Sequence, residues 1–138
     1  MRNQLWAYLA MLLSAIGFAA PAWAQTTATS ITLSWTTPGD DGSTGTASQF
    51  DLRYSTSAIT SANFASATRF NGTPTPSASG STQSVTVTGL VANTPYFFAI
   101  KTGDEVPNWS AISNVISKST LAAPDLIRPA RLAINVGA

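Results

Sequence analysis

The chain has 138 residues, the size of a single domain, and only 9% of them are charged. It contains no cysteine and no histidine, which excludes disulfide bonds, thiolate metal sites and histidine-based acid–base catalysis. The formal net charge of +1 does not suggest nucleic-acid binding, which depends on clustered lysine and arginine side chains.

The first 24 residues have the pattern of a secretory signal peptide. Arg2 supplies the positive charge, Leu5 to Phe18 is apolar, and Ala22-Trp23-Ala24 gives the small-x-small motif of a cleavage site. We expect cleavage after Ala24, no membrane attachment afterwards, and a periplasmic or extracellular location. The alternative is a retained membrane anchor, because the apolar span is near the minimum of about 17 residues for crossing a bilayer. Without Arg2 the positive and negative side chains balance, and the mature net charge is zero.

Two short segments between residues 30 and 55 alternate apolar and polar residues, as half-buried β-strands do. The first strand is predicted from Ser30 to Thr36 and the second from Gln49 to Ser55. On the second strand Asp51 and Arg53 lie two residues apart on the polar face, so we expect a weak surface ion pair worth about 0–1 kcal/mol. The residues expected to point inward from the two strands are Ile31, Leu33, Trp35, Phe50, Leu52 and Tyr54.

The connection between these strands is rich in turn-forming residues, among them Asp40-Asp41-Gly42-Ser43. Carboxylate and carbonyl oxygens there could hold a calcium ion. Adjacent aspartates lack the spacing of an EF-hand loop, so we interpret the segment as a polar turn and predict no metal site. Asp40 and Asp41 remain candidate residues of a binding loop.

The rest of the chain predicts further short strands. Ile59 and Phe64 are expected to be the apolar contacts of a short turn or a single helical turn, and Ala67 to Phe70 reads as a weak edge strand. A strand from Ser84 to Thr88 and a second one beginning at Tyr96 follow, and the last is expected from Ser113 to Lys118. Phe97 falls on the outer face of its strand, where it either covers a neighbour or is exposed.

The loop from Gly103 to Asn108 carries an acidic pair, Asp104 and Glu105. Paired carboxylates hydrolyse glycosides only when they lie on opposite sides of a bond, in a cleft. Neighbours on one exposed loop cannot do this, and the chain has no Ser/His/Asp set. We therefore predict no catalytic residue and no cofactor, and we keep both acids as candidate binding-loop residues.

Five aromatic and aliphatic positions resemble the core of a fibronectin type III domain of the bacterial exported type. They are Trp35, Tyr54, Leu90, Tyr96 and Trp109, and the resemblance covers roughly residues 25–120. It implies an all-β, immunoglobulin-like sandwich of two antiparallel sheets. It also implies that Trp109 caps the core and that the Tyr96 hydroxyl bonds to backbone upstream of it.

The resemblance leaves the first strand of such a sandwich missing or incomplete, because only residues 25–29 precede Ser30 after cleavage. The neighbouring strand would then have an open edge, and open edges invite pairing and self-association. Residues 121–138 either form a linker or the truncated start of a further repeat. In that segment Leu132, Ile134 and Val136 alternate with other residues and could fill the vacant position, on their own domain or on a neighbour.

The sequence thus predicts a secreted, non-catalytic β-sandwich module that acts as a spacer, adhesion or protein-interaction domain. The resemblance implies that such modules stand in tandem or beside the catalytic domains of secreted enzymes. One alternative is a carbohydrate-binding module that stacks a polysaccharide on Trp109, with Phe97 as a second ring. Another is a structural subunit that donates a strand to its neighbour.

Overall fold

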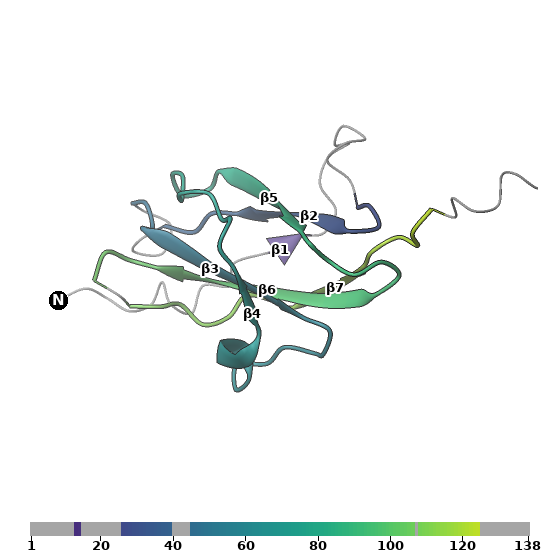
Figure 1. Cartoon of the computed structure of the whole chain (residues 1–138). Coiled ribbons are helices and arrows are strands. Elements are labelled where there is room, and N and C mark those ends of the chain that lie inside the picture. The colour runs from purple at the N-terminus through teal and green to yellow at the C-terminus, as the bar shows by residue number, and fades with distance from the viewer. Residues whose placement is uncertain (1–12, 15–25, 40–44, 107, 125–138) are drawn as a thin grey trace, which may run out of the picture.

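The computed structural model describes residues 13–14, 26–39, 45–106 and 108–124 of the chain. In these residues the fold is all-β, with two antiparallel sheets packed as layers and one short 3-10 helix at Phe64–Ser66 (Figure 1). The predicted fold class is confirmed. One sheet has the order β1-β2-β5 and the other the order β4-β3-β6-β7.

The three-stranded sheet consists of β1 (Leu13–Ser14), β2 (Ser30–Thr36) and β5 (Thr82–Thr88). The four-stranded sheet consists of β3 (Gln49–Ser55), β4 (Thr68–Phe70), β6 (Pro95–Gly103) and β7 (Ile116–Ser119). Strands β2 and β3 have the predicted bounds, because strict alternation over seven residues leaves only one register that buries the apolar side.

The core lies between the two sheets. Trp35 from β2 and Phe50 from β3 meet edge to face, with ring centroids 5.1 Å apart, a preferred geometry for aromatic pairs. Burying each such side chain contributes about 1.5–3 kcal/mol. The buried members of this core are Ile31, Leu33, Trp35, Phe50, Leu52, Val87, Leu90, Tyr96, Phe98 and Ile100. Tyr54 is half-buried against it.

The corner before β6 is closed by a tyrosine, as expected. The backbone N–H of Val91 donates a hydrogen bond of 3.0 Å to the Tyr96 hydroxyl, and Leu90 is buried beside it. This bond satisfies a backbone donor in a turn where Asn93 adopts a positive φ of 51°. The corner therefore joins the β5–β6 connection to the core by both packing and a hydrogen bond.

A second, smaller cluster covers the outer face of the four-stranded sheet. Ile59 and Phe64, from the connection between β3 and β4, are buried against Ala99 of β6. Phe97 packs on this cluster, so its outward position is covered by a neighbouring segment. The connection from residue 56 to residue 67 thus acts as a lid on one side of the sheet, held by two apolar side chains.

The last strand begins later than predicted, at Ile116 instead of Ser113. Serine hydroxyls replace part of the strand ladder before it. The hydroxyl of Ser113 accepts from the N–H of Ile100, and that of Ser110 accepts from the N–H of Thr102, each at 3.0 Å. The segment therefore runs along β6 without regular strand pairing.

On the side opposite β5, strand β2 pairs with β1. Strand β1 has two residues, and its register pairs Leu13 with Trp35 and Ser14 with Ser34. The sequence predicted that the first strand would be missing or incomplete. Among the residues that the structure describes, the strand on this side of β2 is two residues long and belongs to the predicted signal peptide. The other five residues of the seven in β2 have no partner in β1.

Candidate functional site

The loop between β6 and β7 carries Trp109 at the surface, which corrects the expectation that this ring caps the core. Trp109 is 36% exposed. A methyl group placed on Gly103 would come within 3.1 Å of the Trp109 ring, so the ring lies over this glycine. Trp109 also forms a β-bridge with Gly103. The ring packs there because the glycine has no side chain, and it stays at the end of the sandwich, outside both apolar clusters.

Asp104 is the second correction, because it is only 1% exposed instead of lying in the open loop. Its carboxylate accepts hydrogen bonds from the backbone N–H of Asn108 at 2.9 Å and from the Asn108 side-chain amide at 2.8 Å. The aspartate therefore holds the loop closed, whereas Glu105 beside it is exposed. The two acids do not act as a pair, and the spacing Asp-x-x-x-Asn was a turn signal that the sequence reading missed.

The other two candidate loop acids, Asp40 and Asp41, lie outside the described residues. The proposed alternation of Leu132, Ile134 and Val136 also lies outside them. Of the five residues expected in the core, Trp35, Leu90 and Tyr96 are buried there. The remaining two are the half-buried Tyr54 and the exposed Trp109.

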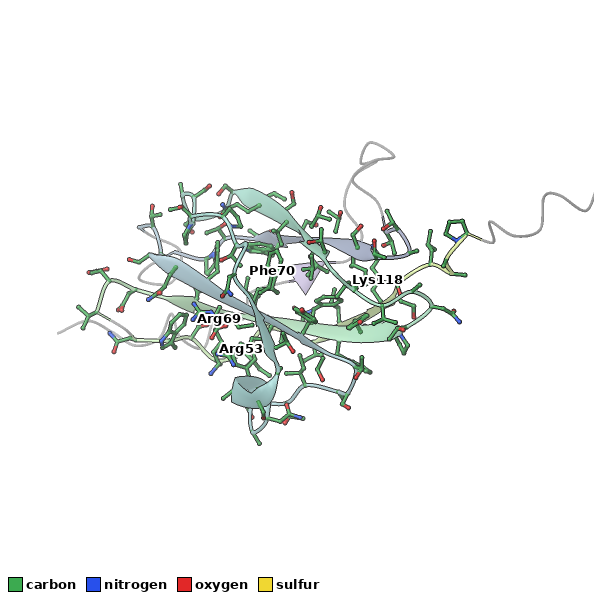
Figure 2. The ribbon with its side chains drawn as sticks, viewed as in Figure 1. Arg53, Arg69, Phe70 and Lys118 are labelled. Carbon is green, nitrogen blue, oxygen red and sulfur yellow. The ribbon has the colours of Figure 1, made fainter. Side chains whose placement is uncertain are left out.

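Arg53 and Asp51 form a partly buried ion pair on the outer face of the four-stranded sheet, where a weak exposed pair was expected. Nε and one terminal nitrogen of Arg53 donate to the two carboxylate oxygens at 2.9 and 3.0 Å. The side chains are 18% and 12% exposed. Bidentate ion pairs of this kind are stronger and more directional than single hydrogen bonds. Arg69, directly across from Arg53 on β4, lies 3.6 Å from the same carboxylate (Figure 2).

Arg53 also attaches the lid to the sheet. It donates to the carbonyl oxygens of Ala65 at 2.6 Å and of Ala67 at 3.3 Å. Its guanidinium carbon lies 5.2 Å from the centre of the Phe64 ring, and the Lys101 ammonium lies 4.9 Å from the same centre. Two cations thus contact one buried ring, an arrangement that the one-dimensional pattern did not reveal.

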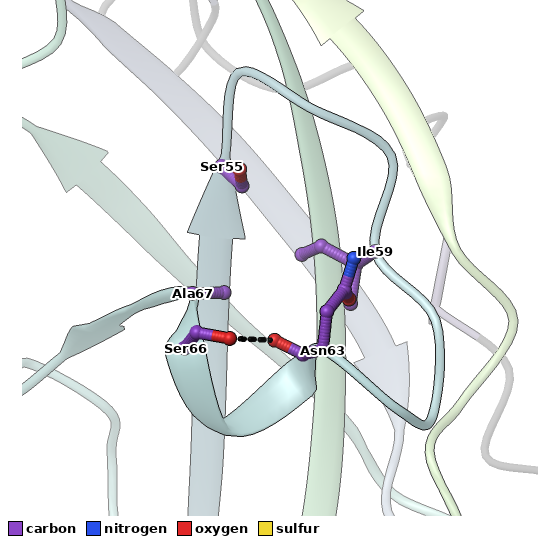
Figure 3. A pocket seen from close by; sticks show the side chains of 5 residues that line it. All are labelled: Ser55, Ile59, Asn63, Ser66 and Ala67. Carbon is purple, nitrogen blue, oxygen red and sulfur yellow. Dashed lines mark hydrogen bonds between the residues drawn. The ribbon is translucent and has the colours of Figure 1, made fainter.

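A shallow hollow of about 110 Å³ opens between the lid and β3 (Figure 3). Ser55, Ile59, Asn63, Ser66 and Ala67 line it, and the Ser66 hydroxyl donates to the Asn63 carbonyl oxygen across it. Small-molecule sites usually need about 300 Å³ or more. This hollow has room for a few water molecules and too little for a typical ligand.

The described carboxylates offer little for chemistry. Both Asp51 and Asp104 use their oxygens to hold the fold together. Among the residues that the structure describes, no three Asp or Glu side chains lie close enough to hold a metal ion. Within that same part of the chain, no helix has the length and apolar character needed to span a membrane.

Residues 20–116 match the family "Purple acid Phosphatase, N-terminal domain". The chain belongs to this family. Purple acid phosphatase N-terminal domains are fibronectin- or immunoglobulin-like β-sandwiches, in agreement with the two sheets of the structure.

The match begins five residues before the expected mature N-terminus at Gln25 and ends within β7. Among solved structures, the chain is similar to the sensor domain of the anti-sigma factor RsgI4 of Pseudobacteroides cellulosolvens. It has 17% sequence identity and a TM-score of 0.48, over 82% of this chain and 96% of that one. No curated protein sequence matches the chain.

Proposed function

We propose that this purple acid phosphatase N-terminal domain is an exported, non-catalytic module that spaces or binds other proteins. The observation that carries the proposal is the family itself, since the matched domain is the N-terminal one of an enzyme and not its catalytic one. The residues agree. A phosphatase that uses metal ions needs several His or carboxylate ligands. This chain has no histidine, and its buried aspartates are engaged within the fold.

The finer assignment to the fibronectin type III class rests on the Tyr96 corner and on Trp35 in the core. That class includes adhesion, spacer and protein-binding modules, and fold alone does not choose among them. The signal-like sequence of residues 1–24 supports action in the periplasm or outside the cell.

Export and lack of catalysis can be tested in one preparation. The full chain is expressed with its leader in a bacterial host. The protein is purified from the periplasmic fraction, and its mass is measured by mass spectrometry. We expect a product that starts at Gln25 and does not hydrolyse p-nitrophenyl phosphate above the buffer rate, with or without added iron and zinc. Hydrolysis that coelutes with the folded protein and disappears on heating would contradict the proposal.

Carbohydrate binding is the second candidate, and the exposed Trp109 ring favours it. The ring is held by Gly103 and by the Asp104–Asn108 hydrogen bonds, so little ordering entropy would be lost on stacking a sugar. Pull-down on insoluble polysaccharides would test it. Trp109→Ala should abolish retention, and Leu121→Ala, which removes another exposed apolar side chain, should leave it unchanged. Equal retention of both variants and the wild type would exclude Trp109 as the platform.

A further inference from the structure

Among the described residues, strand β1 covers only part of the edge of β2. Strand β1 pairs with Ser34 and Trp35, and no described strand lies beside Thr32 on that side. Thr37, just after β2, exchanges backbone hydrogen bonds with Gly80 and Ser81 just before β5. Hydrogen bonds in an antiparallel ladder alternate, so the even-numbered residues of β2 turn their backbone groups away from β5. Removal of the leader would remove β1 as well and open the whole edge, from Ser30 to Thr36.

Two buried polar atoms near this edge have no hydrogen-bond partner in the described structure. They are the indole nitrogen of Trp35 and the hydroxyl of Thr26. Buried indole N–H groups usually find an acceptor. Trp35 lies where β1 pairs, and Thr26 lies shortly before β2 begins. Both residues therefore belong to the strand whose edge is incompletely paired or to the few residues before it.

The C-terminal segment starts close to this edge. The N–H of Leu121 donates to the carbonyl oxygen of Thr27 at 2.9 Å, so the chain leaves the domain beside the first residues before β2. Leu132, Ile134 and Val136 then alternate with Ala133 and Asn135, which matches the one-sided pattern of a half-buried strand.

We propose that residues 128–136 of one mature chain add to the β2 edge of a second copy, antiparallel and head to tail. The inference rests on the proposed export, because cleavage of the leader is what opens the edge. In antiparallel pairing the first residue of the segment lies opposite the last residue of β2. To pair in this way on its own domain, Arg128 would have to reach the Thr36 end of β2, about 30 Å from Thr27. The seven residue steps from Leu121 to Arg128 span at most about 25 Å, which is too short. A second copy docked end to end has no such restriction.

The resulting contact joins two different surfaces, the tail of one copy and the edge of the next. Such head-to-tail contacts give closed rings when the rotation between copies closes, and open chains when it does not. The mature net charge of zero provides no repulsion against this association.

The test uses the mature protein recovered from the periplasm, whose mass reports export and cleavage separately from assembly. Sedimentation velocity across a hundredfold range of concentration should show oligomers that grow with concentration. Replacing the three apolar side chains together (Leu132→Ser, Ile134→Ser and Val136→Ser) should give a monomer. The matched pair Ala133→Ser and Asn135→Ser, on the opposite side of the segment, should assemble like the wild type.

A second variant addresses the receiving edge. Thr32→Pro removes one backbone donor, and proline is tolerated at edge strands, so the variant should fold and remain monomeric. In 15N spectra the wild-type Trp35 indole signal should shift with concentration, and the Trp109 signal should not. A wild type that stays monomeric, or oligomers that persist in the triple variant, would overturn the proposal. A monomer whose melting temperature falls in the triple variant would place the segment on its own domain and would also overturn it.

Discussion

The two sheets of the sandwich are completed in different ways. The lid covers the outer face of the four-stranded sheet. Beside β6, the hydroxyls of Ser110 and Ser113 accept from backbone N–H groups that a further strand would otherwise pair with. In the three-stranded sheet, the described strand on the far side of β2 from β5 is β1, which is two residues long and belongs to the predicted leader. The difference shows that a fold can be well specified in its core and left unfinished at one edge.

The largest expected effect separates the core from the surface. Trp35→Ala removes a ring that is 1% exposed and packed on Phe50, so it should lower the free energy of unfolding by about 3–5 kcal/mol. Urea denaturation followed by circular dichroism measures this change. Trp109→Ala is the matched control and should cost far less, because that ring is already at the surface. Equal losses would mean that Trp109 also belongs to the core.

The next effect tests the lid. Arg53→Ala leaves the Asp51 carboxylate without its closest partner and removes the bonds to Ala65 and Ala67, so we expect a loss of about 1–3 kcal/mol. Thermal unfolding of the variant provides the measurement. Arg69→Ala, which removes a half-exposed arginine 3.6 Å from the same carboxylate, should change stability by no more than about 0.5 kcal/mol. A larger loss for Arg69 would show that the pair is misassigned.

A smaller effect concerns the corner. Tyr96→Phe keeps the ring in the core and leaves the N–H of Val91 without its acceptor, at a cost of about 1 kcal/mol. Chemical denaturation with an unchanged m-value would measure it. Tyr54→Phe serves as the control, since the hydroxyl of Tyr54 makes no hydrogen bond with the described residues, and it should be neutral. If both variants were neutral, the corner bond would not contribute to stability.

The smallest effect is a pH dependence on β7. Burial lowers the pKa of Lys118 from its usual value of 10.5. Between the lowered pKa and 10.5 the unfolded chain binds more protons than the folded one, so this group makes stability rise with pH in that window. Lys118→Arg keeps the charge throughout and should remove that rise. Identical pH profiles for the two proteins between pH 8 and 10.5 would contradict the assigned shift.

The part of the fold that could be predicted is the part with a local pattern. Strict alternation revealed β2 and β3, and the Leu90–Tyr96 spacing revealed the corner. Features that depend on how a loop folds back on itself were missed or misjudged. The burial of Asp104 depends on Asn108 folding back over it, and the exposure of Trp109 depends on the position of Gly103.

The outer face of the four-stranded sheet is a second region that the sequence pattern did not fully predict. Asp51 and Arg53 were recognised as neighbours, yet their burial comes from the lid, whose path across the sheet has no period in the sequence. The late start of β7 depends likewise on two serine hydroxyls that substitute for strand pairing. Alternation reports which face of a strand is buried, and it does not report which loop covers the other face.

Amide hydrogen exchange at Thr32 in the mature protein tests the unfinished edge most directly. The account predicts slow exchange in the wild type at high protein concentration and fast exchange on dilution or in the triple variant of Leu132, Ile134 and Val136. Leu52, in the centre of the four-stranded sheet, should stay protected under every condition. Equally slow exchange at Thr32 in all these samples would show that the edge is already closed within each domain, and would contradict the account.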